Sequence, residues 1–408
     1  MKKNIGIILG TRPEAVKCAP IIWALRADPR FNLVVISTGQ HREMLDGTLA
    51  EFEIVPDVAL AVMRKTQTLS QVTHRIIEGL SQSGCMSGLD AVMVHGDTAT
   101  TLAGALAGLH HEVPVVHIEA GLRSGNIRSP YPEEANRKLV GQIAALHLAP
   151  TPGNAGNLIR EGVRESLIAV TGNTVVDALR WGVGRVSGYG SPALADLDLD
   201  PRRVVLATAH RRESWGKPME EIAQALAEIA KRDDVRVIVP LHYNPAVRKT
   251  MLPVLAGIEN VTITDPLPYL HYCSLLNRSD IVVSDSSGAE EEGPSLGKPT
   301  LVLRDITERH ESVCTGAARL VSRARGPIVA EVNRLLDDPM LWHEMASAMN
   351  PYGDGQAAER SVAALAHFLN LGPAVQPFVA GHLEVEFDTA GVMSNTHNAD
   401  VATKAAAA

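Results

Sequence analysis

Four cysteines, few aromatic residues and no long apolar run set the first limits on this 408-residue sequence. The cysteines lie far apart and form no CxxC pair, which excludes the common zinc and thiol redox motifs and indicates a reduced, metal-free protein. No stretch reaches the roughly 20 apolar residues of a membrane-spanning helix, and the opening run IGIIL is too short for a signal peptide. We therefore expect a cytoplasmic protein with no membrane partner.

A basic excess is also absent. The net charge is −8 and the pI is about 6.0, which argues against a nucleic-acid partner, although a local basic pocket can still hold a phosphate. Apolar residues make up 45% of the chain and charged residues 21%, a balance that supports buried cores. Because 408 residues exceed the usual size of a single core, two domains are expected.

Short Val- and Ile-rich runs alternate with amphipathic segments in both halves of the chain. This alternation predicts an α/β protein with two Rossmann-like domains, each a doubly wound parallel sheet, and an interdomain cleft. We assign residues 1–171 to the first domain, with a returning helix at about 355–371, and residues 172–351 to the second. Residues 372–408 lose all periodicity, so we expect a disordered tail there.

Three carboxylates of the first half follow or close apolar runs, namely Asp97 in HGDT, Glu119 in HIEAG and Glu133 in YPEEANR. The carboxyl ends of parallel strands meet at one edge of a sheet, so these groups should converge there. Gathered carboxylates suggest proton transfer, and they point to general acid and base roles. Two ordinary alternatives stay open: Asp97 can cap the next helix, and Glu133 can pair with Arg137 one turn later.

The first strand ends in LGTRPEAVKCAP, a glycine turn leading into a helix. Gly10 permits close backbone approach, and Pro13 suits the first helical turn. Free N–H groups at this helix start, together with Arg12 and Lys17, predict an anion site. A tight turn with solvated charges explains the same residues equally well.

The second half offers a matching loop in DSSGAEEEGP. Ser286, Ser287 and Gly288 lie between a strand and a helix, where hydroxyls and N–H groups predict a phosphate cradle. Glu291 or Glu292 could then accept hydrogen bonds from a ribose diol, although acidic residues also favour any helix N-terminus.

Two histidines of the second half, His210 in AHRRES and His242 in PLHYNP, end equivalent strands. Each could be structural alone, but as a pair they are candidates for acid chemistry at a diphosphate. No comparable argument applies to His95, and no spacing of His, Cys and Asp predicts a metal site.

Together these segments resemble the bacterial non-hydrolysing UDP-N-acetylglucosamine 2-epimerases. The resemblance runs in order over about residues 1–370, which makes it far more specific than one glycine motif. Its main segments are GTRPEAVKCAPII, VHGDTATTLAGALAG, HIEAGLRSG, SPYPEEANRKL, TGNTVVDAL, AHRRES, DSSGAEEEGPSLGKP and NPYGDGQAAER.

The resemblance implies two domains in the GT-B arrangement, a homodimer, no cofactor, and a UDP-sugar bound in the cleft. It implies reversible C2 epimerisation of UDP-GlcNAc to UDP-ManNAc, by anti elimination of UDP to 2-acetamidoglucal and re-addition of UDP. The residues that it implies as catalytic are Asp97, Glu119, Glu133, His210 and Lys17. Those that it implies as binding the UDP-sugar are Arg12, Arg137, His242, Ser286, Ser287, Gly288 and Glu292.

Some positions depart from the family pattern. Ser287 stands in DSSG where relatives commonly have DSGG, and Glu290 stands where glutamine is common. Relatives also use a second UDP-GlcNAc as an activator, and the residues that match this site are Gln40 and His41. Gly47 replaces a frequent glutamine nearby.

Three other functions compete with epimerisation. A hydrolysing relative would release ManNAc and UDP from UDP-GlcNAc, so free sugar distinguishes it. A GT-B glycosyltransferase would need an acceptor and has less use for three carboxylates. A silent nucleotide-sugar sensor would have no reason to retain them.

Overall fold

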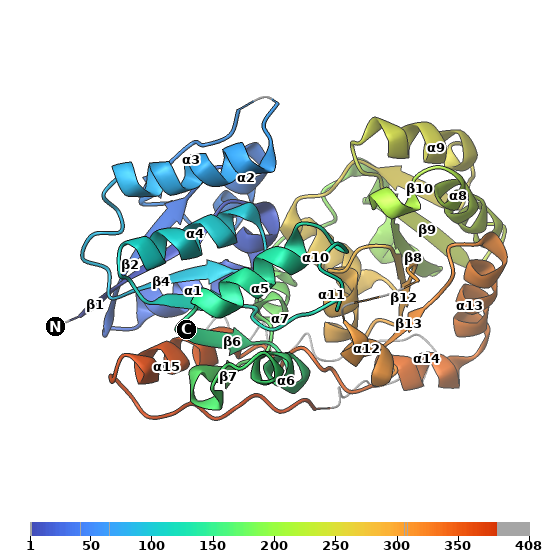
Figure 1. The fold of residues 1–408 in the computed structure, drawn as a ribbon. Helices are drawn as coiled ribbons and strands as arrows, with labels where there is room; N and C mark the ends of the chain where they lie inside the picture. The colour runs from blue at the N-terminus through green and yellow to red at the C-terminus, as the bar shows by residue number, and fades with distance from the viewer. Residues whose placement is uncertain (1, 41, 65, 306, 308, 382–408) are drawn as a thin grey trace. The chain divides into compact units, whose positions relative to one another are not determined.

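Parallel sheets covered by helices on both faces make up the structure (Figure 1), a computed structural model. It describes residues 2–40, 42–64, 66–305, 307 and 309–381. Contacts divide the chain into two units: unit 1 comprises Met1–Ala178 and Tyr352–Val379, and unit 2 comprises Leu179–Pro351 with the segment from Ala380. The predicted fold class, two parallel-sheet α/β domains, is confirmed.

Among the described residues, the sheet of unit 1 has seven parallel strands in the order β3-β2-β1-β4-β5-β6-β7. These strands are β1 (Lys3–Leu9), β2 (Phe31–Ser37), β3 (Val58–Ala59), β4 (Ala91–His95), β5 (Val115–Ile118), β6 (Leu146–Ala149) and β7 (Ile168–Val170). The central β4 and β5 are buried along their whole length, as expected for apolar strands covered on both sides. The strand order reverses between β1 and β4, so the loops after these two strands lie side by side.

Helices cover both faces of this sheet. They are α1 (Arg12–Ala27), α2 (Arg42–Glu51), α3 (Leu69–Gln82), α4 (Ala99–His110), α5 (Glu133–Ile143), α6 (Pro152–Arg160) and α15 (Ala357–Phe368). Helices α3, α4 and α5 pack in one row, and α1 packs between α2 and α15. Local sequence starts the two helices nearest the strand reversal: Thr11 with Glu14 and Thr98 with Thr101 form capping boxes for α1 and α4.

The sheet of unit 2 has six described parallel strands in the order β10-β9-β8-β11-β12-β13, the Rossmann order 3-2-1-4-5-6. They are β8 (Arg203–Thr208), β9 (Val235–Pro240), β10 (Val261–Thr264), β11 (Ile281–Ser284), β12 (Thr300–Val302) and β13 (Ala318–Leu320). The helices are α8 (Lys217–Ile229), α9 (Pro245–Leu255), α10 (Tyr269–Arg278), α11 (Ala289–Ser295), α12 (His310–Cys314), α13 (Arg325–Asp337) and α14 (Pro339–Ala346). Here the reversal lies between β8 and β11.

The chain leaves unit 1 inside α7 (Thr174–Gly182), later than the boundary expected after residue 171. The first turn of α7 stays with unit 1 because Val175 and Val176 pack against Tyr352. The chain then returns to unit 1 as α15.

The first part of the expected tail is packed on unit 1. Phe378 is buried and donates its backbone N–H to Val170 at the end of β7 (2.8 Å). An aromatic side chain buries a large apolar area, which favours packing of this segment on the domain. Residues 382–408 of the expected tail lie outside the described residues. None of the helices in the described part of the chain combines the length and apolar character needed to cross a bilayer.

Asp177 of α7 fastens the start of α15. Its two carboxylate oxygens accept the backbone N–H groups of Ala357 (3.2 Å) and Ala358 (2.8 Å). Burial raises the pKa of Asp177 to about 6 against these hydrogen bonds. The native state therefore binds this proton more tightly than the unfolded chain, so the stabilisation is complete below about pH 4 and is lost as the pH rises through about 6.

We expect Asp177→Asn to remove this pH dependence, since the amide mimics the neutral acid. Relative to the variant, the wild-type protein should lose roughly 3 kcal/mol of unfolding free energy between about pH 4 and about pH 7. Urea titrations of both proteins at stepped pH measure the difference. A difference that does not change with pH would show that Asp177 titrates normally.

Candidate active site

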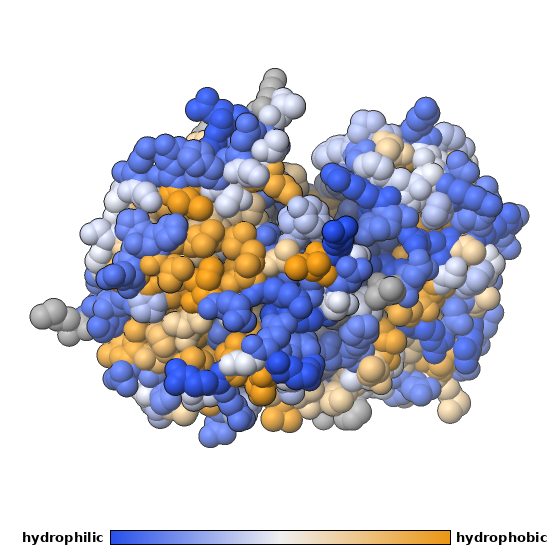
Figure 2. Space-filling view, in the orientation of Figure 1, coloured by the Kyte–Doolittle hydropathy of each residue, from blue (hydrophilic) through white to orange (hydrophobic). Residues whose placement is uncertain are grey.

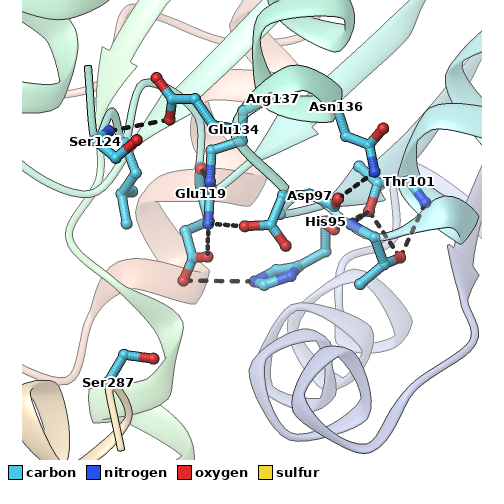
Figure 3. A network of polar contacts seen from close by, with 12 residues as sticks. His95, Asp97, Thr101, Glu119, Ser124, Glu134, Asn136, Arg137 and Ser287 are labelled. Atoms are coloured by element: carbon cyan, nitrogen blue, oxygen red, sulfur yellow. Dashed lines mark hydrogen bonds and ion pairs between the residues drawn. The ribbon is translucent and has the colours of Figure 1, made fainter. Parts of the chain in front are cut away.

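Glu119 occupies the centre of a buried polar cluster in unit 1 (Figure 3). It follows β5 directly and has a φ of 60°, a left-handed conformation that few non-glycine residues adopt. Arg137 of α5 donates to its backbone carbonyl (2.8 Å) and to its carboxylate (3.1 Å). Lys17 of α1 forms an ion pair with the same carboxylate, and Asn173 donates to it (3.2 Å). Strain of this kind persists only where surrounding contacts fix it.

Asp97 joins this cluster through Arg137. The Arg137 Nη2 lies 2.6 Å from the Asp97 carboxylate, so one guanidinium bridges the carboxylates that follow β4 and β5. Asp97 does not cap α4, because Thr98 occupies the N-cap position. The sequence analysis expected Asp97, Glu119 and Glu133 to converge at one sheet edge. In the structure Asp97 and Glu119 are joined there by Arg137.

Glu133 begins α5 and is half-buried, one helical turn before Arg137. Its neighbour Glu134 is 2% exposed and points away from the cluster. Glu134 accepts the backbone N–H groups of Ser124 (3.0 Å) and Gly125 (3.3 Å), which ties down the loop between β5 and α5. The two adjacent carboxylates therefore have different tasks, and Glu134 has a structural one.

Gly10 is required for packing at the end of β1. A Cβ atom there would lie 2.2 Å from the hydroxyls of both Thr38 and Thr100. This contact, rather than ligand approach, accounts for the glycine. Arg12 follows as the first residue of α1 and is half-buried, whereas Lys17 is buried against Glu119.

His95 is a residue of the cluster that the sequence analysis set aside. It ends β4, is 4% exposed, and places Nε2 at 4.0 Å from the Glu119 carboxylate. Burial lowers the pKa of His95 to about 4, although the Glu119 carboxylate opposes this shift. The imidazole is therefore neutral at pH 7. Its Nε2 has no hydrogen-bond partner among the described residues.

Glu14 links two of the loops at this edge. It accepts the backbone N–H groups of Gly10 (2.6 Å) and Thr11 (2.8 Å) and the hydroxyl of Thr98. Burial raises the pKa of Glu14 to about 6 against these hydrogen bonds. The loops after β1 and β4 thus share one buried carboxyl group.

In unit 2, as in unit 1, a buried acid joins two loops where the strand order reverses, here between β8 and β11. Asp285, which is fully buried, accepts the backbone N–H groups of His210 (3.0 Å) and Arg211 (3.0 Å). The hydroxyls of Thr208 and Ser284 are hydrogen-bonded across the same strand pair (2.7 Å). Asp285 therefore fixes the loop after β8 to the loop after β11.

His210 and His242 lie side by side. Their rings stack with centroids 5.3 Å apart and planes 16° apart. His242 accepts the N–H of Asn244 through Nδ1 (3.0 Å), so its Nε2 carries the proton when the ring is neutral. Burial lowers the pKa of His210, and His242 lowers it further, while Asp285 opposes both.

The loop after β11 is held largely by its own groups. The backbone N–H of Ser286 donates to the Ser284 hydroxyl (2.9 Å), and that of Gly288 donates to the Ser286 hydroxyl (3.3 Å). In this structure these two N–H groups are therefore engaged within the loop itself. Ser287 instead accepts a hydrogen bond from the Arg211 guanidinium (2.6 Å). Glu292 is half-buried on α11.

The sequence analysis also addressed an activator site and metal binding. Gln40, expected near an activator, accepts hydrogen bonds from the Thr100 hydroxyl (2.8 Å) and backbone N–H (3.3 Å). His41 lies outside the described residues. Within the described ranges, no group of three His, Cys, Asp or Glu side chains could hold a metal ion.

Sequence reasoning missed Glu14, Asp285 and His95 as parts of these sites. Glu14 and Asp285 gave a local signal, since each is an acidic residue at a strand or helix end. Their partners lie on strands that become neighbours only in the folded sheet, and that signal is absent from the sequence.

Comparison with known proteins shows the family. The family model described as UDP-N-acetylglucosamine 2-epimerase matches residues 23–366. The UDP-N-acetylglucosamine 2-epimerase of Yersinia pestis is 48% identical over 367 residues, which cover 88% of this chain and 97% of that protein.

Solved structures extend the match to the whole fold. The S. aureus MnaA structure with UDP is 41% identical with a TM-score of 0.84, covering 93% of this chain and 100% of that one. The UDP-GlcNAc 2-epimerase of Neisseria meningitidis bound to UDP-GlcNAc is 40% identical with a TM-score of 0.83, covering 89% and 100%. The two sheets described above thus belong to a GT-B-like fold.

Proposed function

The chain belongs to the UDP-N-acetylglucosamine 2-epimerase family, and we propose that it interconverts UDP-GlcNAc and UDP-ManNAc by the non-hydrolysing route. In this route a base removes the C2 proton while the C1–O bond to UDP breaks, which gives 2-acetamidoglucal and UDP. A proton then returns to C2 from the opposite face, and UDP adds again at C1. Atoms and charges balance without a cofactor.

The observation that carries this proposal is the bridging of Asp97 and Glu119 by Arg137. Two carboxylates from neighbouring strands, fixed by one cation, can exchange protons with a sugar that lies against them. We assign Asp97, Glu119 and Glu133 to this acid and base chemistry. Lys17 keeps the Glu119 carboxylate oriented.

Solved relatives contain UDP or UDP-GlcNAc, and we assign binding of the UDP moiety mainly to the hydroxyls and imidazoles of unit 2. His210 is placed to stabilise the departing diphosphate, since a nearby anion favours its cationic form. The other residues proposed to bind the UDP-sugar are Arg12, Arg137, His242, Ser286, Ser287, Gly288 and Glu292.

Epimerisation by this route requires exchange of the C2 hydrogen with solvent. In deuterated water, the enzyme should place deuterium at C2 of both UDP-GlcNAc and UDP-ManNAc, because the proton that returns comes from a group in exchange with solvent. Proton NMR and mass spectrometry of the two nucleotide sugars measure it. Products without deuterium would exclude C2 deprotonation. Accumulation of free ManNAc and UDP would instead identify a hydrolysing enzyme, and turnover only with an added acceptor would identify a glycosyltransferase.

Ser287 should act on nucleotide affinity through Arg211. Ser287→Gly and Ser287→Ala both remove the hydroxyl that holds the guanidinium, so each should weaken UDP binding about fivefold, the equivalent of about 1 kcal/mol. The alanine variant separates the lost hydroxyl from added backbone freedom. Calorimetric titration with UDP measures both. In an Arg211→Ala background the same changes should have no further effect, and unchanged affinity in the wild-type background would contradict the role.

Two partners complete the proposal. A second UDP-GlcNAc is proposed to bind as an activator near Gln40 and His41. A second copy of the chain is proposed to pack on unit 1, where Figure 2 shows apolar residues gathered over α4. Leu109 of α4 and Leu139 of α5 are 54% and 53% exposed, and α4 packs against α5; exposed apolar side chains on adjoining helices suit a protein interface.

The dimer proposal predicts that charge on this face separates the subunits. Leu109→Glu and Leu139→Glu together should convert a particle of twice the 43.6 kDa chain mass into a monomer, because two buried carboxylates would oppose each other. Size-exclusion chromatography with light scattering measures the mass. Leu199→Glu is the matched control, since Leu199 is 89% exposed in unit 2. A double variant that stays dimeric would place the interface elsewhere.

A further inference from the structure

The turn of residues 95–98 carries Asp97 from β4 into α4, and buried side chains hold it at every residue. At His95 and Thr98, the two ends of this turn, the hydrogen bonds are of the kind found at the start of a helix. The Thr101 hydroxyl donates to the backbone carbonyl of His95 (2.5 Å), and the Thr98 hydroxyl donates to Glu14. A capping box alone would have been enough to begin α4.

Two additional side chains hold the carbonyls on either side of the Asp97 Cα. His117 of β5, which is fully buried, lies with Nε2 2.7 Å from the carbonyl of Gly96. A carbonyl can only accept, so Nε2 carries the proton. Asn136 of α5 is 6% exposed, and its amide donates to the carbonyl of Asp97 (2.7 Å).

These two hydrogen bonds fix the backbone angles of Asp97. The Gly96 carbonyl sets the plane of the peptide before Asp97, and the Asp97 carbonyl sets the plane of the peptide after it. Because each peptide is planar, holding both planes fixes φ and ψ between them. The direction of the Asp97 Cβ follows, and Arg137 holds the far end of the side chain (2.6 Å).

Both carbonyls precede the N-cap Thr98, so the hydrogen bonds of α4 do not include them. Burying an imidazole or an amide costs free energy unless it gains a defined partner, and here each buried donor takes one of these two carbonyls as its partner. Both side chains also come from the elements that carry Glu119 and Arg137. The sequence thus places two buried donors beside the residue whose carboxylate needs a fixed direction.

We propose that His117 and Asn136 are positioning residues that aim the Asp97 carboxylate at the reacting sugar. The inference rests on the proposed function, in which Asp97 acts as an acid or base. A misaimed carboxylate slows proton transfer while leaving binding of the nucleotide intact, since effective molarity depends steeply on the position of the reacting group.

The test is a double-mutant cycle of Asn136→Leu with Asp97→Asn. Asn136→Leu removes the donor at similar volume. It should lower kcat about 10- to 100-fold in the wild-type background, with KM and the Kd for UDP nearly unchanged. In the Asp97→Asn background, which should itself lose about 10²- to 10⁴-fold, the same change should lower kcat less than about twofold. Asn136→Asp, which keeps the shape and removes a donor, replaces the leucine variant if that does not fold.

A control variant separates a loss of stability from a loss of positioning. Asn260→Leu removes a comparable amide in unit 2, which donates to the carbonyls of Ala230 (3.1 Å) and Arg232 (2.9 Å). It should lower the thermal midpoint with kcat maintained. Equal losses from Asn136→Leu in both backgrounds, or no loss in the wild type, would overturn the positioning inference alone. Near-normal turnover of Asp97→Asn would overturn the proposed role of Asp97 as well.

Discussion

The ion-paired carboxylate of Glu119 is the interaction on which unit 1 depends. A carboxylate buried this deeply is costly unless cations and donors surround it. Lys17 from α1, Arg137 from α5 and Asn173 from the segment before α7 all reach it. Those three elements are thereby fixed to the end of β5 by one charge. Arg137 extends the same constraint to Asp97, so the two carboxylates cannot be arranged independently.

Both units use the same topology for different chemistry. In each sheet the strand order reverses between the first and fourth strands of a Rossmann series, at β1 and β4 and at β8 and β11. A buried acid then joins the two loops: Glu14 in unit 1 and Asp285 in unit 2. On this common base, unit 1 presents carboxylates and cations, whereas unit 2 presents hydroxyls and imidazoles. The first set suits proton exchange with a sugar, and the second suits a leaving anion.

The sequence predicts most of this fold because its long strands and helices have clear apolar patterns. The strands β3, β7 and β13 escape prediction, since two or three residues are too few to show a period. Asp97 and Glu119 could be placed at one sheet edge because strand ends in a parallel sheet must meet. The side chains that hold them, such as His117 and Asn136, could not be identified. The sequence does not show which polar residues become buried or which groups they contact. Ser287 stood out as a departure, yet its partner Arg211 appears only in the folded loop.

Asp285 lies next to His210 in unit 2 and affects the pKa of its imidazole. Both carboxylate oxygens of Asp285 accept backbone N–H groups, and Oδ1 lies 3.9 Å from Nδ1 of His210. Burial lowers the pKa of His210 and His242 lowers it further, while the Asp285 carboxylate raises it in part. A diphosphate placed beside His210 supplies further negative charge and raises that pKa. Under the proposed function, in which the diphosphate lies beside His210, linkage means that nucleotide binding and proton uptake by His210 strengthen each other.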